Sequence, residues 1–461
     1  MSQPDKMKGM ETLSCQIITE KEMRQENRTR VLCMKKAKLL FWNTSLNRYS
    51  INALLGALEN SCELFDIIDI GFFIKTNDIY ESIDDLKKYE KVIVAFSFFT
   101  PQIWDVNNLI TQLAPIRDEL DIVFVAGGPH ATGDPVRTVT TLGFDYALLG
   151  ESEATFPIFI LRIIEGISLT GLKGICYKDH DGNVINTGQS DPVDITKYTP
   201  VSLRFRRIGP VEITRGCPYG CSFCQTGHIL GRCTRHRPTE QIYNILKAMK
   251  TELNASHFRA ITPNALSYGS GNGVDLNLPE LEKLLITVRK ALGPGAKIHM
   301  GSFPSEVRPN NVTNESIGLL KRFVSNRDLV VGAQSGSERI LKLSHRGHSV
   351  DDVYKAVEII TRHGFLANVD FIFGLPGETV EDAEMTVKMM SDLADMGARI
   401  HAHTFMPLPQ TEFENAPYGR VKHQIRKMLR DLTPKGIVFG NWEEQARLSK
   451  KIHTYLAKGI L

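Results

Sequence analysis

The sequence predicts an α/β protein with two successive units that each contain a parallel β-sheet, followed by a short helical segment. Short apolar runs alternate with stretches in which apolar residues recur at helical spacing, as in parallel strands connected by helices. The pattern pauses near residue 166 and restarts near residue 206. With 461 residues, the chain is long enough for two or three domains. We therefore expect an N-terminal extension, a first domain, a connector, a second domain and a C-terminal segment over residues 1–35, 36–165, 166–205, 206–410 and 411–461.

Five apolar runs in the first domain predict an open, Rossmann-like sheet. Each run is nearly continuous in apolar residues, which is typical of strands covered by helices on both faces. Helical spacing follows the first run, at Ile51, Leu55 and Leu58, and the second run, over Ile79–Tyr89. The predicted strands are Lys38–Trp42, Phe65–Ile70, Lys91–Ser97, Asp121–Gly128 and Asp145–Gly150.

The carboxyl ends of these strands supply the candidate ligand contacts, because ligands of open parallel sheets bind at that edge. The third strand ends near two hydroxyl residues. Two glycines follow the fourth strand and lack side chains, so a bulky ligand could approach the backbone there. The candidates are Ser97, Thr100, Gly127, Gly128, Pro129, His130, Gly150 and Glu151.

Six further apolar runs in the second domain predict a partial (β/α)6 barrel. Helical patterns separate the runs, such as the one that begins after Thr239 and the one over Val380–Met396. The chemistry of such barrels is placed at the carboxyl ends of the strands. The predicted strands are Val211–Thr214, His257–Pro263, Lys297–Phe303, Asp328–Ser335, Leu366–Gly374 and Arg399–Leu408.

Cys217, Cys221 and Cys224 directly follow the first strand of this barrel. A tight loop there can aim three thiolates at one point, and thiolates suit an iron–sulfur cluster or zinc. Structural zinc sites usually take four ligands from two separated halves. No second half is visible, although Cys233 or His228 could in principle supply a fourth ligand. Three cysteines would leave one iron of a cluster open to a substrate or cofactor.

The Cys-x-x-x-Cys-x-x-Cys pattern in this position resembles the radical S-adenosylmethionine (AdoMet, SAM) superfamily. Turns over residues 206–410 resemble the same family, among them Gln334–Gly336, Phe373–Glu378 and the Met-Pro-x-Pro segment at Met406–Pro409. The resemblance implies a 4Fe–4S cluster whose open iron binds AdoMet and whose electron cleaves it to a 5′-deoxyadenosyl radical. It also implies AdoMet contacts by Phe223, Ser302, Ser305, Glu306, Arg308, Gln334 and Ser335.

The strand ends of the first domain resemble the cobalamin-binding domain that precedes many radical AdoMet domains, over about residues 36–165. That family shows Ser or Thr after the third strand, Gly-Gly-Pro-His after the fourth and Gly-Glu-x-Glu after the fifth, as here. The resemblance implies that the eight strand-end candidates contact cobalamin.

Two departures from these families are visible. Many cobalamin domains place a cobalt-ligating histidine after the first strand, whereas this loop, Asn43–Tyr49, contains none. Many radical AdoMet domains carry Gly-Gly-Glu after the second barrel strand, whereas this sequence has Thr262–Tyr268. Asn264 or backbone carbonyls could replace that contact.

The two halves together resemble cobalamin-dependent radical AdoMet methyltransferases, which alkylate unreactive carbons. The resemblance implies that one AdoMet methylates cobalamin and a second supplies the radical that removes hydrogen from the substrate. The substrate carbon then takes the methyl group. Both cofactors must face one cavity, so we expect the active site between the domains. An electron donor such as ferredoxin or flavodoxin is implied as a partner, and no catalytic acid or base is assigned.

The whole-chain pattern, including Ile261–Ser267 and Gly332–Gly336, resembles an archaeal subgroup that is found in methanogens. One activity in that subgroup is C-methylation of a glutamine in methyl-coenzyme M reductase. The resemblance therefore implies a polypeptide substrate, the alpha subunit of that reductase, presented before or during its folding.

Three alternatives stay open. Methylthiotransferases resemble the chain around Gln334 and Met406, but they carry three further cysteines in the N-terminal domain, where this chain has Cys33 and Cys62. A second alternative is an enzyme that uses cobalamin and a radical without transferring a methyl group. The third is a cobalamin-binding sensor with a structural metal, which has no need of an open iron.

Composition excludes other classes. A formal net charge of +3 gives no reason to expect a nucleic-acid partner. The sequence contains no run of 18 or more apolar residues and no signal peptide, so we expect a cytoplasmic protein without a membrane span.

Residues 1–30 are polar and predict a loosely docked extension. The tail over 411–461 is expected to be a packing helix rather than a lid over the cavity.

Overall fold

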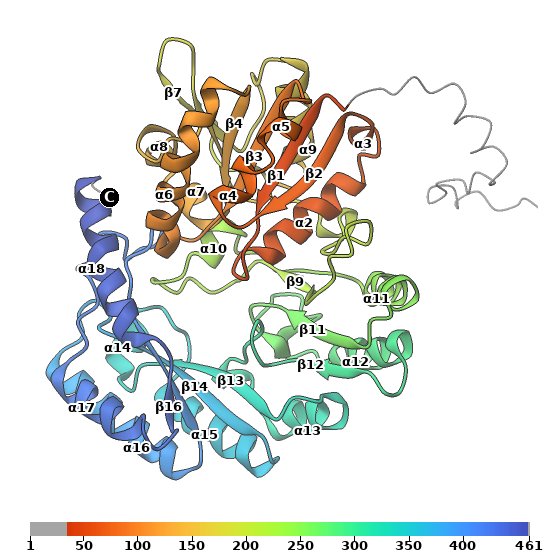
Figure 1. The fold of residues 1–461 in the computed structure, drawn as a ribbon. Helices are drawn as coiled ribbons and strands as arrows, with labels where there is room; N and C mark the ends of the chain where they lie inside the picture. Colours follow the sequence, from red (N-terminus) through yellow and green to blue (C-terminus); the bar gives the residue numbers. More distant parts are fainter. Residues whose placement is uncertain (1–34, 460–461) are drawn as a thin grey trace, which may run out of the picture.

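The computed structural model describes residues 35–459, so the extension expected over residues 1–35 lies almost entirely outside the described residues. It consists of an α/β domain and a partial barrel, which are drawn in red to yellow and in green to blue (Figure 1). The predicted fold class is confirmed. Within residues 35–459, no helix is long and apolar enough to cross a membrane.

The first domain has a seven-stranded sheet in the order β2-β1-β3-β4-β5-β6-β7. Its first five strands are parallel, and the last two, which lie in the expected connector, are antiparallel. The strands are β1 (Ala37–Trp42), β2 (Ile68–Phe73), β3 (Lys91–Ser97), β4 (Ile122–Gly127), β5 (Tyr146–Leu148), β6 (Ile175–Lys178) and β7 (Val184–Asn186). The helices are α2 (Arg48–Glu59), α3 (Leu64–Ile67), α4 (Thr76–Tyr80), α5 (Ile83–Leu86), α6 (Ile103–Leu113), α7 (Gly128–Gly133), α8 (Pro135–Thr140) and α9 (Thr155–Glu165).

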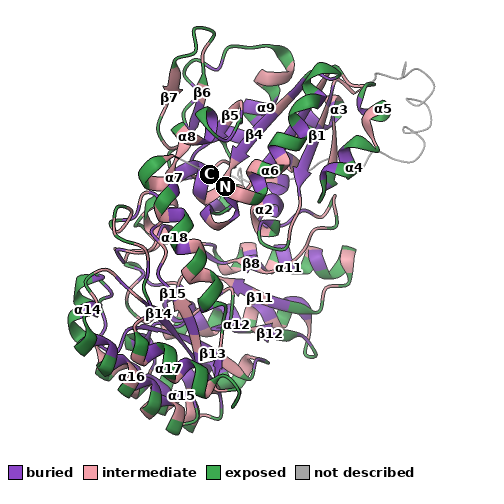
Figure 2. Ribbon diagram, turned by 60° about the vertical axis from the view of Figure 1, so that its left-hand side comes forward, coloured by how far each residue is buried: buried purple, intermediate pink, exposed green. Residues whose placement is uncertain are grey.

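Alternation along β1 explains why both faces of this sheet are covered. Leu39 and Phe41 pack with α2 and α9, whereas Leu40 and Trp42 pack with α4 and α6. Because successive side chains of a strand point to opposite faces, one apolar run supplies two hydrophobic cores. Figure 2 shows the resulting buried strands between layers of helices with exposed outer surfaces.

Two boundaries in the first domain were predicted wrongly. The second strand was expected at Phe65–Ile70, but β2 begins at Ile68, and Phe65 lies in α3. The parallel register with β1 sets this shift, because it pairs Ala37 with Ile68 and Trp42 with Phe73. The helix expected over Ile79–Tyr89 is divided into α4 and α5.

The second domain is an open barrel made of two parallel sheets, β12-β11-β8 and β13-β14-β15-β16. Bridges between Thr262 and Ser305 and between Val307 and Val331 join them. The strands are β8 (Val211–Glu212), β11 (His257–Ile261), β12 (Lys297–His299), β13 (Asp328–Gln334), β14 (Leu366–Phe373), β15 (Arg399–Thr404) and β16 (Val438–Phe439), with a separate antiparallel pair, β9 (Thr214–Arg215) and β10 (Arg235–His236). The helices are α10 (Thr226–Ile229), α11 (Thr239–Leu253), α12 (Leu278–Leu292), α13 (Asn314–Phe323), α14 (Glu338–Leu343), α15 (Val350–Arg362), α16 (Val380–Asp395), α17 (His423–Leu432) and α18 (Trp442–Lys458).

The six predicted barrel strands are all present, and three end earlier or break where the backbone turns. β12 ends at His299, before Gly301, which has a positive φ of 74°. β15 ends at Thr404 and is followed by the segment with Pro407 and Pro409, which have no backbone N–H to donate. The first predicted strand is split into β8 and β9.

The C-terminal helix α18 joins the two domains. Trp442, at its start, belongs to the barrel core, whereas Tyr455, near its end, is fully buried in the core of the first domain. Arg137 Nη2 in α8 donates a hydrogen bond of 3.0 Å to Leu456 O. Lys451 Nζ lies 4.9 Å from the ring centre of Trp104 in α6. Helix α18 of this tail therefore packs on both domains (Figure 1), and its Gln445 lines a cavity of the barrel.

Tyr455→Ala is expected to destabilise the protein by about 3 kcal/mol, because it removes a large side chain from a closed core. Chemical denaturation monitored by circular dichroism measures the loss. Lys450→Ala, at an exposed position of the same helix, is the control and should stay within about 0.5 kcal/mol of the parent. Equal stability of the two variants would contradict the docking of α18.

Candidate active site at the mouth of the barrel

The three cysteines lie on a loop that starts at the end of β9 and is held at several points. Gly216 has a φ of 84°, and a Cβ there would lie 2.2 Å from Cys233 O, so the position requires glycine. Cys217 N donates to Gly231 O over 3.0 Å, and Ser222 N donates to Ser344 O over 3.1 Å. These backbone bonds fix the loop between the barrel strands and α14.

Arg215, two residues before the first cysteine, is the centre of a buried ion network. Its guanidinium lies 2.8 Å from Glu212, 3.0 Å from Glu151 and 2.6 Å from Glu153. Arg235 also pairs with Glu151. Burial opposes ionisation of Glu153, but the Arg215 guanidinium outweighs it and lowers the pKa of that carboxyl. Because Glu151 and Glu153 follow β5, this network connects the first domain to the cysteine loop.

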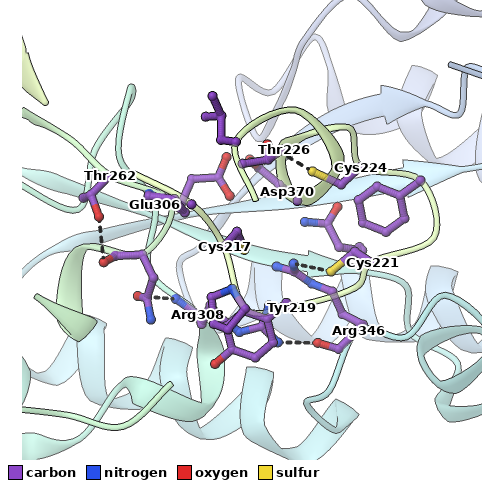
Figure 3. Close-up of a pocket in the computed structure, with 18 of the residues that line it drawn as sticks. Cys217, Tyr219, Cys221, Cys224, Thr226, Thr262, Glu306, Arg308, Arg346 and Asp370 are labelled. Carbon is purple, nitrogen blue, oxygen red and sulfur yellow. Dashed lines mark hydrogen bonds between the residues drawn. The ribbon is translucent and has the colours of Figure 1, made fainter. Parts of the chain in front are cut away.

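The loop opens on a cavity of about 570 Å³ inside the barrel mouth (Figure 3). The cavity wall contains all three cysteines and charged side chains from four other places in the barrel. Arg346 extends toward Cys221, and its Nη1 lies 3.6 Å from Cys221 Sγ. The charged residues in the wall are Glu212, Arg215, Glu306, Arg308, Arg346 and Asp370.

The cysteine sulfurs are spread more widely than the ligands of a single zinc ion. Zinc–sulfur bonds of about 2.3 Å hold any two ligand sulfurs within about 4.6 Å of each other. Among the described residues, the only three metal-ligating side chains with ligand atoms within 4.8 Å of one another are Asp370, His401 and His403, so the cysteine sulfurs are spread more widely. Burial raises the pKa of the Cys217 and Cys224 thiols, so a bound cation is needed to hold them as thiolates.

Four of the seven residues predicted to bind AdoMet line this cavity: Phe223, Glu306, Arg308 and Gln334. Burial raises the pKa of Glu306 to about 7, with a further contribution from repulsion by Asp370. Arg308 stacks on Tyr219, with its guanidinium carbon 3.4 Å from the ring centre.

The other three, Ser302, Ser305 and Ser335, are buried and are not among the residues that line the cavity. Ser305 Oγ accepts a bond of 3.0 Å from Gly301 N and donates one of 3.1 Å to Ser302 O. Ser335 Oγ accepts a bond of 3.2 Å from Ser337 N. The hydroxyls of Ser305 and Ser335 thus stabilise turns around the cavity. Ser302 Oγ has no hydrogen-bond partner among the described residues.

Sequence reasoning missed several cavity residues. Arg346 Nη2 donates a hydrogen bond of 2.8 Å to Gly332 O, and its Nη1 faces Cys221 Sγ. Asp370 in β14 and His403 in β15 also line the cavity. The period of two along β15 could have placed His403 on the inner face of the barrel. Arg346 lies in the loop after α14, where no spacing rule marks it.

The residues predicted to contact cobalamin surround the carboxyl edge of the first sheet. Gly128 has a φ of 86°, and a Cβ there would lie 2.8 Å from Ser97 Oγ. Gly127 is open, with only Phe96 O, at 3.8 Å, near the position of a Cβ. Two large apolar side chains on the adjacent loops, Leu46 and Phe99, are 59% and 42% exposed. Exposed apolar groups beside bare backbone fit a large ring such as cobalamin.

Four of these predicted contacts also have other partners. Glu151 forms ion pairs with Arg215 and Arg235. Gly150 N donates a hydrogen bond of 3.0 Å to Thr132 Oγ1. Thr100 and His130 are fully buried and contact each other, with 3.2 Å between Oγ1 and Nδ1.

The loop after β1, which lacks the expected histidine, is organised by Asn47. Asn47 Nδ2 donates hydrogen bonds of 2.8 Å to Trp42 O and 3.0 Å to Ser97 O. Its Oδ1 accepts a hydrogen bond of 2.8 Å from Thr44 N. The side chain therefore joins the ends of β1 and β3, which flank the point where the strand order reverses.

The cysteine loop contacts this edge of the first domain directly. Gln225, the residue after the last cysteine, donates from Nε2 to Pro129 O over 3.4 Å and to Pro409 O over 2.9 Å. A Cβ on Gly133 would lie 2.9 Å from the Pro409 side chain, so α7 also packs closely on the end of the barrel. The predicted cobalamin edge and the cysteines thus meet at one interface.

Comparison with known protein families agrees with both halves. Residues 46–160 match the B12 binding domain, and residues 211–390 match the Radical SAM superfamily. The chain therefore carries a B12-binding domain followed by a radical SAM domain. It is a radical SAM enzyme whose cofactors are a 4Fe–4S cluster, AdoMet and cobalamin.

Three archaeal relatives are similar over most of the chain. An uncharacterised protein of Methanocaldococcus jannaschii is 26% identical, with 74% of this chain and 73% of that protein covered. An uncharacterised methyltransferase of Pyrococcus horikoshii is 24% identical, with 67% and 66% covered. A second Methanocaldococcus jannaschii protein, named as a methylthiotransferase, is 27% identical, with 73% and 74% covered.

Solved structures share the two-domain fold. The radical AdoMet methyltransferase TsrM from Kitasatospora setae, with cobalamin and a [4Fe–4S] cluster bound, superposes with a TM-score of 0.62 at 17% identity, covering 83% of this chain and 75% of that one. The cobalamin-dependent AdoMet radical enzyme OxsB gives a TM-score of 0.60 at 17% identity, covering 90% and 59%.

The triple variant Cys217→Ala, Cys221→Ala, Cys224→Ala is expected to lose the iron of the reconstituted enzyme and keep its cobalt. Elemental analysis after anaerobic reconstitution with iron, sulfide and cobalamin measures both. The single variant Cys233→Ala, outside the motif and exposed, is the control and should keep about four irons. Iron retained in the triple variant would contradict this assignment.

His130 predicts a dependence of stability on pH. Burial, with a contribution from Arg137, lowers its pKa from 6.5 to about 3, so the folded protein holds this ring neutral. Below pH 6.5 the unfolded chain takes up a proton that the folded chain does not, so stability falls as pH decreases, by about 1.4 kcal/mol per unit. His130→Gln should show a shallower decrease between pH 6.5 and 5 in chemical denaturation, and identical slopes would refute this origin.

Proposed function

We propose that this chain is a cobalamin-dependent radical SAM methyltransferase that methylates an unactivated carbon of a protein residue. The observation that carries the proposal is the contact of Gln225, beside the cluster cysteines, with Pro129 at the carboxyl edge of the B12-binding domain. It brings the cysteine loop to the edge where cobalamin is predicted to bind. The relative from Pyrococcus horikoshii and the structure of TsrM are both named as methyltransferases.

The bound cofactors would supply the radical that removes a hydrogen atom from the substrate and the methyl group that replaces it. The chain holds and orients them. Cys217, Cys221 and Cys224 would hold the cluster, and Arg346 would direct a positive charge at the Cys221 sulfur. Arg308 and Gln334, in the same cavity wall, offer hydrogen bonds to the polar groups of AdoMet.

Apolar residues of the cavity wall would exclude water from the radical. Phe223 and Phe405 both line the cavity, together with Ile372, Met406 and Leu408. Closing the site against water protects reactive intermediates from side reactions.

The proposed substrate is a polypeptide glutamine, in the alpha subunit of methyl-coenzyme M reductase. The relatives from a methanogen, Methanocaldococcus jannaschii, support a methanogen function. Phe303, next to the cavity residue Pro304, is 72% exposed and offers an apolar contact to a peptide chain. The proposed electron donor is a reduced ferredoxin or flavodoxin.

Methylthiotransfer is the second candidate, because one relative carries that name. Such enzymes resemble this chain around Gln334, but they use three further cysteines in the N-terminal domain. The described part of the first domain contains only Cys62, which is exposed, and Cys176, which is buried in β6. The cysteine content therefore favours methylation.

The test is to incubate the reconstituted enzyme, AdoMet and reduced flavodoxin with a peptide that spans the candidate glutamine of the reductase alpha subunit. We expect a peptide mass increased by one CH2 group, located on glutamine by fragmentation. The cluster-free triple cysteine variant is the control and should leave the peptide unchanged.

Other outcomes are distinguishable. A gain of CH2S would establish methylthiotransfer instead. Cleavage of AdoMet with an unchanged peptide would refute this substrate, and the same result with a panel of reductase peptides and with small-molecule acceptors would refute methyl transfer.

A further inference from the structure

A second group of metal-ligating side chains lies in the barrel, formed by Asp370, His401 and His403. Asp370 belongs to β14, and the two histidines belong to β15. The register pairs Asp370 with His401 directly, and His403 lies two residues further along β15. Because strand residues two apart share a face, all three side chains gather on one side of the sheet. Asp370 and His403 line the cavity.

The distances within this group match those of a metal site. Asp370 Oδ1 and His401 Nδ1 are 2.9 Å apart, and His401 Nδ1 and His403 Nε2 are 3.1 Å apart. With bonds of about 2.1 Å, adjacent ligand atoms around one ion are about 3.0–3.4 Å apart. Two of the three separations are therefore those of adjacent ligands around one ion, and all three ligand atoms lie within 4.8 Å of one another.

Protons alone do not satisfy the group. His401 Nδ1 faces both a carboxylate oxygen and a second imidazole nitrogen, yet a ring nitrogen offers either one N–H or one lone pair. If it donates to Asp370, it has no lone pair for His403. A cation placed between the three atoms would accept a lone pair from each.

The surroundings hold the rings in place. His401 stacks on Phe439, with ring centres 4.4 Å apart and planes 5° apart. His403 Nδ1 lies 3.3 Å from Gln445 Nε2. Gln445 Oε1 accepts a hydrogen bond of 2.9 Å from Thr404 N. An ion on His403 Nε2 would put the ring proton on Nδ1, so the Gln445 amide would have to turn its oxygen toward it and give up the bond from Thr404 N. Such outer contacts orient metal ligands.

We propose that Asp370, His401 and His403 bind one divalent transition-metal ion, in addition to the cluster. Two imidazoles and one carboxylate suit Zn²⁺ or Fe²⁺ better than Mg²⁺ or Ca²⁺, which prefer oxygen ligands. Because Asp370 and His403 line the cavity, an oxygen or nitrogen of a substrate could complete the coordination of such an ion.

The test adds Zn²⁺ alone to the reconstituted holoenzyme, removes the excess by desalting and counts zinc, iron and cobalt. We expect about one zinc per chain, with unchanged iron and cobalt. His403→Gln and Asp370→Asn should each bind zinc at least tenfold more weakly. His363→Gln, at the end of α15, is the matched histidine control and should bind zinc like the parent.

X-ray absorption at the zinc edge makes the test independent of the variants. We expect a first shell of nitrogen and oxygen at about 2.0–2.1 Å, whereas zinc on the cluster cysteines would give sulfur at about 2.3 Å. A sulfur shell, no stoichiometric zinc in the parent, or full zinc in both folded variants would overturn the proposal. None of these readouts depends on methyl transfer, so failure here leaves the proposed function untouched.

Discussion

The fold depends on how one buried arginine is neutralised. Arg215 is 7% exposed, and three carboxylates from two domains surround its guanidinium. An unpaired charge at such depth would cost several kcal/mol, so the arginine and its partners must be buried together or not at all. Glu151 and Glu153 can reach it only if β5 of the first domain lies against the start of the cysteine loop. The position of the loop relative to the first domain is thus set by charge neutralisation.

The other interdomain contacts are consistent with that geometry. Gln225 bridges Pro129 and Pro409, and α18 reaches from the barrel core into the core of the first domain. Polar contacts thus lie next to the cysteines, and apolar contacts lie further out. This arrangement keeps the cavity open while the domains are held on two sides.

The sequence predicted the fold because near-continuous apolar strands and helical spacing are local patterns. The cysteine motif also predicted its own place in space, since it directly follows a strand of a barrel. Strand boundaries were predicted wrongly where strand pairing determines them, as in β2, whose start is fixed by its register with β1. The domain connector likewise contributes β6 and β7, whose short runs gain stability only by extending an existing sheet.

Predicting individual site residues was harder. Phe223, Glu306, Arg308 and Gln334 line the cavity, but the hydroxyls of Ser305 and Ser335 bond to nearby backbone. A short polar side chain after a strand serves a turn or a ligand equally well, and the sequence pattern is the same. Asp370 meets His401 and His403 through the pairing of β14 with β15, and Arg346 joins the cavity wall from the loop after α14, so these contacts are not encoded in a local spacing.

The burial of Tyr455 has a consequence for synthesis of the protein. Domains of a growing chain generally fold in order from the N-terminus. Here the core of the first domain includes a side chain from the last helix, so that core stays incomplete until the whole barrel has been translated. The nascent first domain therefore spends the entire synthesis of the second with one apolar surface uncovered. During that interval the edge predicted to receive cobalamin also lacks its contact with Gln225 of the barrel.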